Sequence, residues 1–139
     1  MSERFFVPDE SAMLALGKRL AREAKPGDLI YLQGDLGAGK TTITRGFLKA
    51  LGITYSVKSP TFTLVEVYEL DDFYVFHFDL YRITDPKELS QIGLSDYLTE
   101  DAICLIEWPE KAAGYLPEPT QYCTIEIPEN SEGRWVTLK

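Results

Sequence analysis

The chain has 139 residues, 45% of them hydrophobic, and a formal net charge of −8. This length and composition are typical of one globular domain, so we expect a single domain over residues 1–139. The excess of Asp and Glu argues against a protein that holds nucleic acid by itself, because such binding needs Lys and Arg to neutralise phosphates. It still allows a nucleic-acid pathway in which a partner makes that contact.

The two cysteines, Cys104 and Cys123, lie in apolar stretches that are typical of strands. Their spacing fits neither a metal site nor a disulfide framework. The first seven residues are interrupted by Pro8 too early to form a signal peptide, and no apolar run is long enough to span a membrane. These features predict a reduced, cytoplasmic setting.

In chain order, the first expected elements are a short strand at 4–7 and a helix at 11–24, with Asp9 as the helix N-cap. An apolar strand at 29–32 then leads into a glycine-rich loop. The helix that follows the loop runs to Leu51, and Gly52 marks its C-terminal end.

In the second half, the runs at 64–69 and 73–79 are joined by Asp71 and Asp72, which predicts an antiparallel hairpin. Residues 85–91 predict a short helix, and residues 96–101 a polar, exposed segment. The run at 102–107 is apolar throughout, which is typical of a central strand. Segments 121–127 and 134–138 predict a closing hairpin.

The glycine-rich loop fits the spacing of a phosphate-binding loop: Gly, four residues, then Gly-Lys-Thr. Glycines let the backbone bend sharply and approach a ligand, and the N–H groups of such a bend form an anion site. A helix that begins after the loop points its positive dipole end at the same anion. The motif consists of Gly34, Asp35, Leu36, Gly37, Ala38, Gly39, Lys40 and Thr41.

Two residues at the end of this motif have chemical roles of their own. Lys40 supplies a charge for the β- and γ-phosphates, and we expect its side chain to be an exposed cation that faces the ligand. The Thr41 hydroxyl is a ligand for Mg²⁺. A glycine-rich turn without a ligand is the alternative, which the strand before the loop and the helix after it disfavour.

Two carboxylates end apolar strands and are candidates for the second half of a phosphoryl-transfer site. Asp79 follows one strand and Glu107 ends another, and both are expected at the same edge of the sheet. Such a site needs a carboxylate to hold Mg²⁺ or to orient water. The alternative for each is an acid at a strand end that only contacts solvent.

Four further residues have both a functional and a structural interpretation. Thr61 lies in a Ser-Pro-Thr loop that is either a switch near the γ-phosphate or an ordinary turn. His77 alternates with phenylalanines, which favours a packed or hydrogen-bonded structural histidine over a general base. Trp108 shields a nucleotide, presents a partner surface or packs in the core. For Arg82 a surface ion pair is favoured over a phosphate contact.

The nucleotide base is predicted from an absence. The sequence contains no Asn-Lys-x-Asp or Thr-Lys-x-Asp segment of the kind that guanine-specific switch proteins use. This favours adenine.

Four blocks of sequence together resemble one family. They are the glycine-rich loop through Thr42, then residues 58–66 around the Ser-Pro-Thr segment, then residues 77–82 with Asp-Leu-Tyr-Arg, then residues 105–110 with Ile-Glu-Trp-Pro-Glu. In this order they resemble the bacterial TsaE family, small ATPases of tRNA threonylcarbamoyladenosine biosynthesis. The blocks lie between about Leu29 and Lys111, and the combination is far more specific than the loop alone.

The resemblance implies a P-loop NTPase fold with a mixed central sheet flanked by helices, and ATP and Mg²⁺ as ligands. It implies TsaB and TsaD as partners, with TsaD carrying out the transfer to tRNA while ATP hydrolysis keeps the partner complex turning over. Carried over by motif, Lys40 and Thr41 hold phosphate and metal, Glu107 is a metal-side carboxylate, and Asp79 is required for hydrolysis. The loop at Thr61 is a switch, and Trp108 lies near the nucleotide.

Arg134 lies outside the four blocks, in the closing hairpin, and is a further candidate for an adenine contact. Two other classes of function stay open. One is a nucleotide-dependent small-molecule kinase, which the lack of an arginine-rich lid segment disfavours. The other is a nucleotide-gated binding module with negligible turnover.

Overall fold

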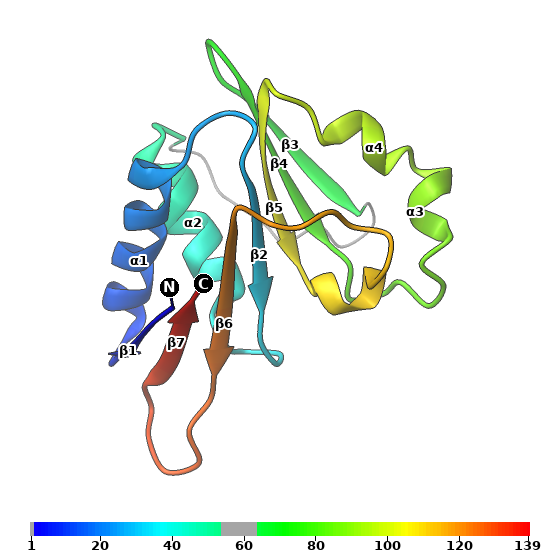
Figure 1. The fold of residues 1–139 in the computed structure, drawn as a ribbon. Coiled ribbons are helices and arrows are strands. Elements are labelled where there is room, and N and C mark those ends of the chain that lie inside the picture. The colour runs from blue at the N-terminus through cyan, green and yellow to red at the C-terminus, as the bar shows by residue number, and fades with distance from the viewer. Residues whose placement is uncertain (1, 54–63) are drawn as a thin grey trace. The chain divides into compact units, whose positions relative to one another are not determined.

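A computed structural model describes residues 2–53 and 64–139. In this part of the chain helices and strands alternate in a mixed α/β arrangement, as the sequence predicted (Figure 1). The strands are β1 (Glu3–Val7), β2 (Leu29–Gln33), β3 (Val65–Glu69), β4 (Tyr74–Asp79), β5 (Ala102–Glu107), β6 (Gln121–Glu126) and β7 (Arg134–Leu138). The helices are α1 (Glu10–Glu23), α2 (Lys40–Ala50), α3 (Glu88–Gln91), α4 (Leu94–Tyr97) and the 3-10 helix η1 (Pro109–Ala112).

The chain divides into two compact units. Unit 1 comprises Met1–Ala24, Gln33–Lys58 and Tyr122–Lys139, and unit 2 comprises Lys25–Leu32 and Ser59–Gln121. The expectation of one domain over residues 1–139 stays a prediction.

In unit 1 three strands form an antiparallel arrangement in the order β1-β7-β6. Val136 on β7 pairs with Phe5 on one side and with Ile125 on the other, and it is fully buried. The expected closing hairpin of β6 and β7 is therefore confirmed, with β1 as the added edge strand.

Helices α1 and α2 of unit 1 lie side by side at very close range (Figure 1). A Cβ added to Gly17 of α1 would come within 2.1 Å of the carbonyl oxygen of Ile43. A Cβ added to Gly46 of α2 would come within 2.2 Å of the carbonyl oxygen of Leu14. Only glycine permits this backbone approach, which fixes α2 against α1.

Helix α1 begins and ends almost where the sequence predicted. The Asp9 carboxylate accepts a hydrogen bond from the N–H of Ala12 at 2.9 Å, so Asp9 is the N-cap. The apolar face of α1 is buried through Met13, Leu16 and Leu20. After α2, Gly52 has a φ of +92°, which confirms it as the glycine that ends the helix.

In unit 2 four strands follow the order β2-β5-β4-β3. Strand β5 pairs in parallel with β2 and with β4, whereas β3 and β4 form the predicted antiparallel hairpin. All six residues of β5 are buried, as expected for a central strand.

The helical connection between β4 and β5 differs from the prediction. Helix α3 begins only at Glu88, and α4 was not predicted. In the polar segment 96–101, Asp96 and residues 99–101 are exposed as expected. Leu94 is buried, and the ring of Tyr97 packs edge-on against Phe76 and Phe78, with centroids 4.9 and 5.2 Å away. These aromatic contacts stabilise α4. The helix was not predicted because four residues are too few to show a periodic pattern in the sequence.

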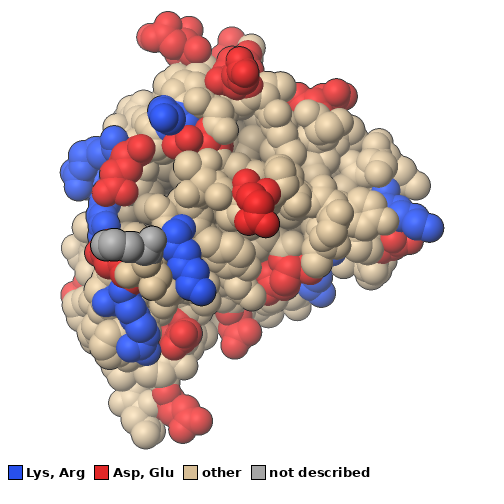
Figure 2. Space-filling model, viewed as in Figure 1, with Lys and Arg blue, Asp and Glu red and all other residues tan. Residues whose placement is uncertain are grey.

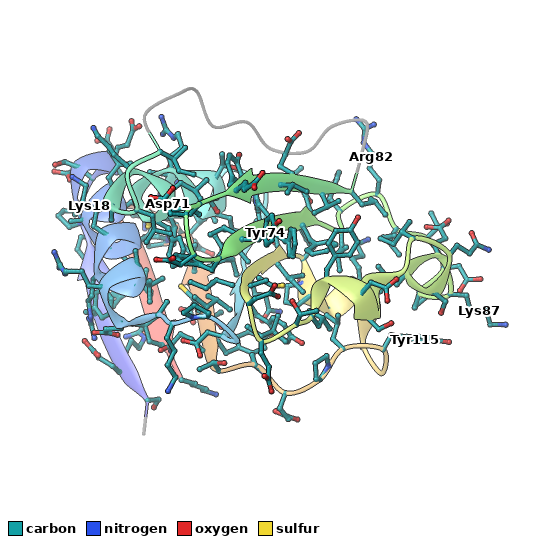
Figure 3. The ribbon with its side chains drawn as sticks, turned by 90° about the horizontal axis from the view of Figure 1, so that it is seen from above. Lys18, Asp71, Tyr74, Arg82, Lys87 and Tyr115 are labelled. Atoms are coloured by element: carbon teal, nitrogen blue, oxygen red, sulfur yellow. The ribbon has the colours of Figure 1, made fainter. Side chains whose placement is uncertain are left out.

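Exposed side chains surround this part of unit 2. In Figure 3, Lys87 and Tyr115 project away from the ribbon into solvent. Tyr115 keeps 47% of its surface exposed, so it does not belong to the core. None of the helices in residues 2–53 and 64–139 has both the length and the apolarity to cross a bilayer.

Candidate functional site

The glycine-rich loop between β2 and α2 bends through conformations that favour glycine. Gly37 has a φ of +80° and Gly39 a φ of +119°, both in the left-handed region that side chains rarely adopt. Gly39 is also the N-cap of α2, and no side chain caps this helix end. The first turn of a helix has N–H groups without helical partners, so the loop and the helix end together suit an anion.

Lys40 is the first residue of α2, and its side chain turns back over the loop. Its ammonium donates to the carbonyl oxygen of Gly34 and lies 3.4 Å from that of Asp35. Lys40 is only 5% exposed, so the expectation of an exposed cation is wrong. Loop carbonyls hold the charged end, and the aliphatic stem is enclosed.

Arg134 on β7 reaches the same loop from the other end of the chain. Its Nε donates to the carbonyl oxygen of Ala38 at 3.2 Å, and its Nη2 donates to that of Gly37 at 3.1 Å. The guanidinium thus holds the backbone on which an anion would rest. Arg134 therefore contacts the predicted phosphate-binding loop, whereas an adenine contact stays a prediction.

A cavity of about 350 Å³ opens beside the loop, entirely within unit 1. Its volume falls in the range of ligand pockets in proteins, ~300–1,000 Å³. The walls combine loop backbone, two arginines, three carboxylates and an apolar patch from β1 and α1. The lining residues are Val7, Asp9, Glu10, Met13, Gly37, Ala38, Gly39, Thr42, Arg45, Glu132 and Arg134.

The remaining predicted loop residues differ in exposure. Asp35 and Leu36 form the exposed tip of the loop, and Leu36 keeps 64% of its surface exposed. Thr41 and Thr42 are half-buried in the first turn of α2. Unit 1 therefore brings together every predicted loop residue and Arg134.

The two candidate carboxylates are neighbours in unit 2. Asp79 ends β4 and Glu107 ends β5, and these residues are paired in the parallel register of the two strands. Their predicted place at a common strand edge is therefore confirmed within this unit. Glu107 is only 2% exposed, which excludes the alternative of a solvated strand-end acid at this position. Asp79 is half-buried, and its carboxylate accepts a hydrogen bond from the N–H of Tyr81 at 3.0 Å.

Glu107 has a partner that the sequence did not reveal. The Nε2 atom of His77 lies 2.5 Å from Oε2 of Glu107, and His77 is fully buried. The sequence predicted a packed or hydrogen-bonded histidine, and this is confirmed. The partner itself was missed, because the two residues are 30 positions apart and meet only through the strand register.

Trp108 follows Glu107 directly and has an unusual backbone. Its φ of +60° is the only positive φ among the non-glycine residues that the structure describes. Its ring lies 5.0 Å from that of Tyr81, and its N–H donates to the carbonyl oxygen of Leu32 at 3.2 Å. Such a conformation costs on the order of 1–3 kcal/mol and is often found next to functional groups.

Asp79, Glu107 and Trp108 belong to unit 2, whereas the loop and Arg134 belong to unit 1. Thr61 lies outside the described residues. Within residues 2–53 and 64–139, no three His, Cys, Asp or Glu side chains are grouped to hold a metal ion.

The charges of the sequence are divided unevenly between the units. Unit 2 carries 14 Asp and Glu against four Lys and Arg, whereas unit 1 carries eight against ten. In Figure 2, most of the Lys and Arg in view lie over the region of α1, β1 and β7. The unit with the glycine-rich loop is thus slightly basic in a strongly acidic protein, which favours an anionic ligand there.

Comparison with known proteins identifies the family. The model of the family described as "Threonylcarbamoyl adenosine biosynthesis protein TsaE" matches residues 7–136. The chain belongs to the TsaE family. The resemblance predicted from the four sequence blocks is therefore confirmed.

Relatives and a solved structure agree with this assignment. The chain is 51% identical to the TsaE protein of Haemophilus influenzae over 118 residues, which cover 81% of this chain and 75% of the relative. It is 44% identical to TsaE of Bacillus subtilis over 111 residues, which cover 80% and 68%. Both relatives are named as tRNA threonylcarbamoyladenosine biosynthesis proteins. The crystal structure of YdiB from Bacillus subtilis matches with a TM-score of 0.83 at 33% identity, covering 99% of this chain and 84% of that one.

Proposed function

We propose that this TsaE-family protein is a Mg²⁺-dependent ATPase with a P-loop NTPase fold. In this proposal it supports a TsaB–TsaD complex in threonylcarbamoyladenosine modification of tRNA, and it is not itself the transferase. The family and the names of its relatives supply the pathway. The glycine-rich loop is the basis for proposing ATPase activity.

The observation that carries the proposal is the geometry of this loop. Two glycines at positive φ bend the backbone, an uncapped helix end follows, and Lys40 stands at the first helical position. Arg134 fixes the loop carbonyls, and a cavity lies directly beside the loop. In this assignment the loop binds the phosphates of ATP, and the cavity beside it receives the rest of the nucleotide.

The residues present also suit a magnesium ion. Mg²⁺ prefers oxygen ligands, and it is commonly held by one or two protein groups together with phosphate oxygens. We assign the Thr41 hydroxyl to it from the phosphate-loop motif, and the Glu107 carboxylate from the family resemblance alone. Bound there, the ion would neutralise charge that develops on the phosphates.

The other assigned residues act on the phosphates and on water. Lys40 is assigned to the β- and γ-phosphates, where its charge favours the transition state more than the ground state. Asp79 is assigned to the orientation of the attacking water. Its hydrogen bond with the N–H of Tyr81 holds its carboxylate in one orientation.

The partner proteins account for what this chain lacks. With a net charge of −8 it has too little basic surface to hold tRNA, so tRNA contact is left to TsaB and TsaD. ATP influences such a partner only if the partner binds the two nucleotide states with different affinity. The loop at Thr61 is our candidate for the switch, and a cytoplasmic location follows from this role.

The experiment is to measure phosphate release from ATP by the purified protein, alone and with TsaB–TsaD, in parallel with partner binding in ATP and in ADP. We expect slow hydrolysis without any acceptor, a changed rate with the partners, and partner affinity that depends on the nucleotide. Phosphate transfer that requires a small acceptor would instead indicate a kinase. Nucleotide binding without turnover, with or without partners, would indicate a binding module.

A further inference from the structure

We propose that His77 is a positioning residue for Glu107, which orients its carboxylate by holding one of the two oxygens. This inference rests on the proposed function, because orientation matters only if Glu107 serves the metal side of the site. Nothing in the family assignment or in the motifs gives His77 a role.

The two residues are brought together by the register of parallel strands. His77 on β4 is paired with Leu105 on β5, and Asp79 is paired with Glu107 two positions further along. Residues two apart in a strand lie on the same face, so His77 and Glu107 share a face and meet diagonally. Nε2 of His77 lies 2.5 Å from Oε2 of Glu107, which leaves Oε1 for another ligand.

Burial gives this contact its importance. His77 is 0% exposed and Glu107 is 2% exposed, so water does little to orient the carboxylate. A buried carboxylate needs hydrogen-bond donors, and a hydrogen bond away from water is electrostatically stronger. The imidazole is thus the group that restricts how the Glu107 side chain rotates.

Packing alone does not explain a histidine at this position. The neighbours of His77 in β4 include Phe76 and Phe78, and an apolar side chain at 77 would fill the same space without burying polar atoms. Nδ1 of His77 is buried without a hydrogen-bond partner in the part of the chain that the structure describes. The hydrogen bond of this ring therefore goes to Glu107, through Nε2.

The direction of the hydrogen bond follows from the acceptor. Carboxylate oxygens of an ionised glutamate only accept, so the geometry assigns the hydrogen to Nε2, which donates to Oε2. Groups that orient a metal-binding side chain in this way commonly raise metal affinity, and their loss costs about 10–100-fold.

The test uses substitutions of His77 that place a hydrogen-bond donor at the position of Nε2, at the position of Nδ1, or nowhere. In His77→Gln the amide nitrogen takes roughly the place of Nε2, whereas in His77→Asn it takes that of Nδ1 and does not reach Glu107. His77→Leu removes all donors. Val75→Ala is the matched control, because Val75 is a fully buried residue of β4 on the same face and has no polar group.

The measurement is the affinity for a fluorescent ADP analogue at increasing Mg²⁺ concentration and in EDTA, with a thermal melt for each variant. We expect His77→Leu and His77→Asn to raise the Mg²⁺ midpoint by about 10–100-fold while affinity in EDTA is unchanged. His77→Gln and Val75→Ala should stay close to the wild type. In a Glu107→Gln background, the His77→Asn change should have no further effect on the midpoint.

A wild-type Mg²⁺ midpoint in His77→Asn would overturn the positioning role while leaving the ATPase proposal intact. If His77→Leu does not fold, the comparison of Asn with Gln still decides, since both side chains are polar. Equal losses in Asn and Gln would also overturn it. A wild type whose nucleotide affinity ignores Mg²⁺ would instead contradict the proposed function, and the positioning role with it.

Discussion

Nε of Arg134 donates to the carbonyl oxygen of Ala38 at 3.2 Å, which ties the last strand of the chain to the glycine-rich loop. Nη2 of the same guanidinium donates to the preceding carbonyl of the loop, that of Gly37, at 3.1 Å. The loop therefore has a support that lies about a hundred residues away in sequence.

We predict that Arg134→Ala weakens ADP binding by roughly 5–30-fold, because hydrogen bonds from a charged donor contribute about 1–2 kcal/mol when partly exposed. Calorimetric titration with ADP measures the effect. Arg4→Ala is the control, since Arg4 is an exposed arginine of unit 1 that contacts Glu126 and Trp135. Equal affinities in the wild type and in Arg134→Ala would show that the loop does not depend on this support.

The close contact of α1 and α2 makes an unusual prediction for Gly46→Ala. In an isolated helix this change stabilises by about 1 kcal/mol. Here the new Cβ would lie 2.2 Å from the carbonyl oxygen of Leu14, so we expect the free energy of unfolding to fall by about 2 kcal/mol or more. Urea unfolding measures it, with Lys49→Ala, exposed in the same helix, as the control. A variant as stable as the wild type would refute this close helix contact.

The two buried thiols predict a loss of stability at alkaline pH. Burial raises the pKa of Cys104 and of Cys123 to about 12. The unfolded chain then releases these protons near pH 9, whereas the folded chain keeps them. The stabilisation that the two protonated thiols contribute is therefore fully present below pH 9 and is lost between about pH 9 and 12. The expected slope is up to about 1.4 kcal/mol per pH unit for each thiol.

Urea unfolding at several pH values tests this prediction by comparing the wild type with a Cys104→Ala/Cys123→Ala variant. The double variant should lose less stability per pH unit above pH 9, whatever its stability at pH 7. Parallel curves would contradict the assigned burial of the thiols.

For the strand-end carboxylates we predict two different defects. Glu107→Gln should raise the Mg²⁺ concentration needed for half-maximal ATP hydrolysis. Asp79→Asn should lower turnover while nucleotide affinity is largely kept. The substitution removes the interaction assigned to the attacking water and does not remove a contact that binds the nucleotide. Mg²⁺ titrations of the hydrolysis rate separate the two, with exposed Glu110→Gln as the control. Unchanged turnover and metal dependence in both variants would make the carboxylate assignment wrong.

Much of the fold could be predicted because the hydrophobic pattern and the capping residues of these segments favour the same elements that their packing stabilises. The run at 102–107 is apolar up to the Glu107 carboxylate and ends before Pro109, and β5 has these bounds. Asp9 before an amphipathic stretch predicted the start of α1, and its carboxylate caps the helix. In contrast, α4 is held by aromatic rings of β4, and a four-residue helix has no period to detect.

The candidate site was predictable only as far as its motif is local. The loop residues are consecutive, so their spacing identified them. The contact of His77 with Glu107 needs the register of two parallel strands, and the burial of Lys40 needs the loop conformation. No role was predicted from the sequence for Gly17 and Gly46, and only the packed structure shows that they allow two backbones to approach.

The most direct test of the ATPase claim is phosphate release from ATP by the wild type and by Lys40→Ala, at saturating Mg²⁺, with a thermal melt of each. Lys18→Ala, a lysine of α1 without a place in the loop, is the control. We predict that Lys40→Ala melts as a folded protein and that its hydrolysis falls by at least about 100-fold, because the charge that we assign to the phosphates is lost. Hydrolysis by Lys40→Ala at the wild-type rate would contradict the claim.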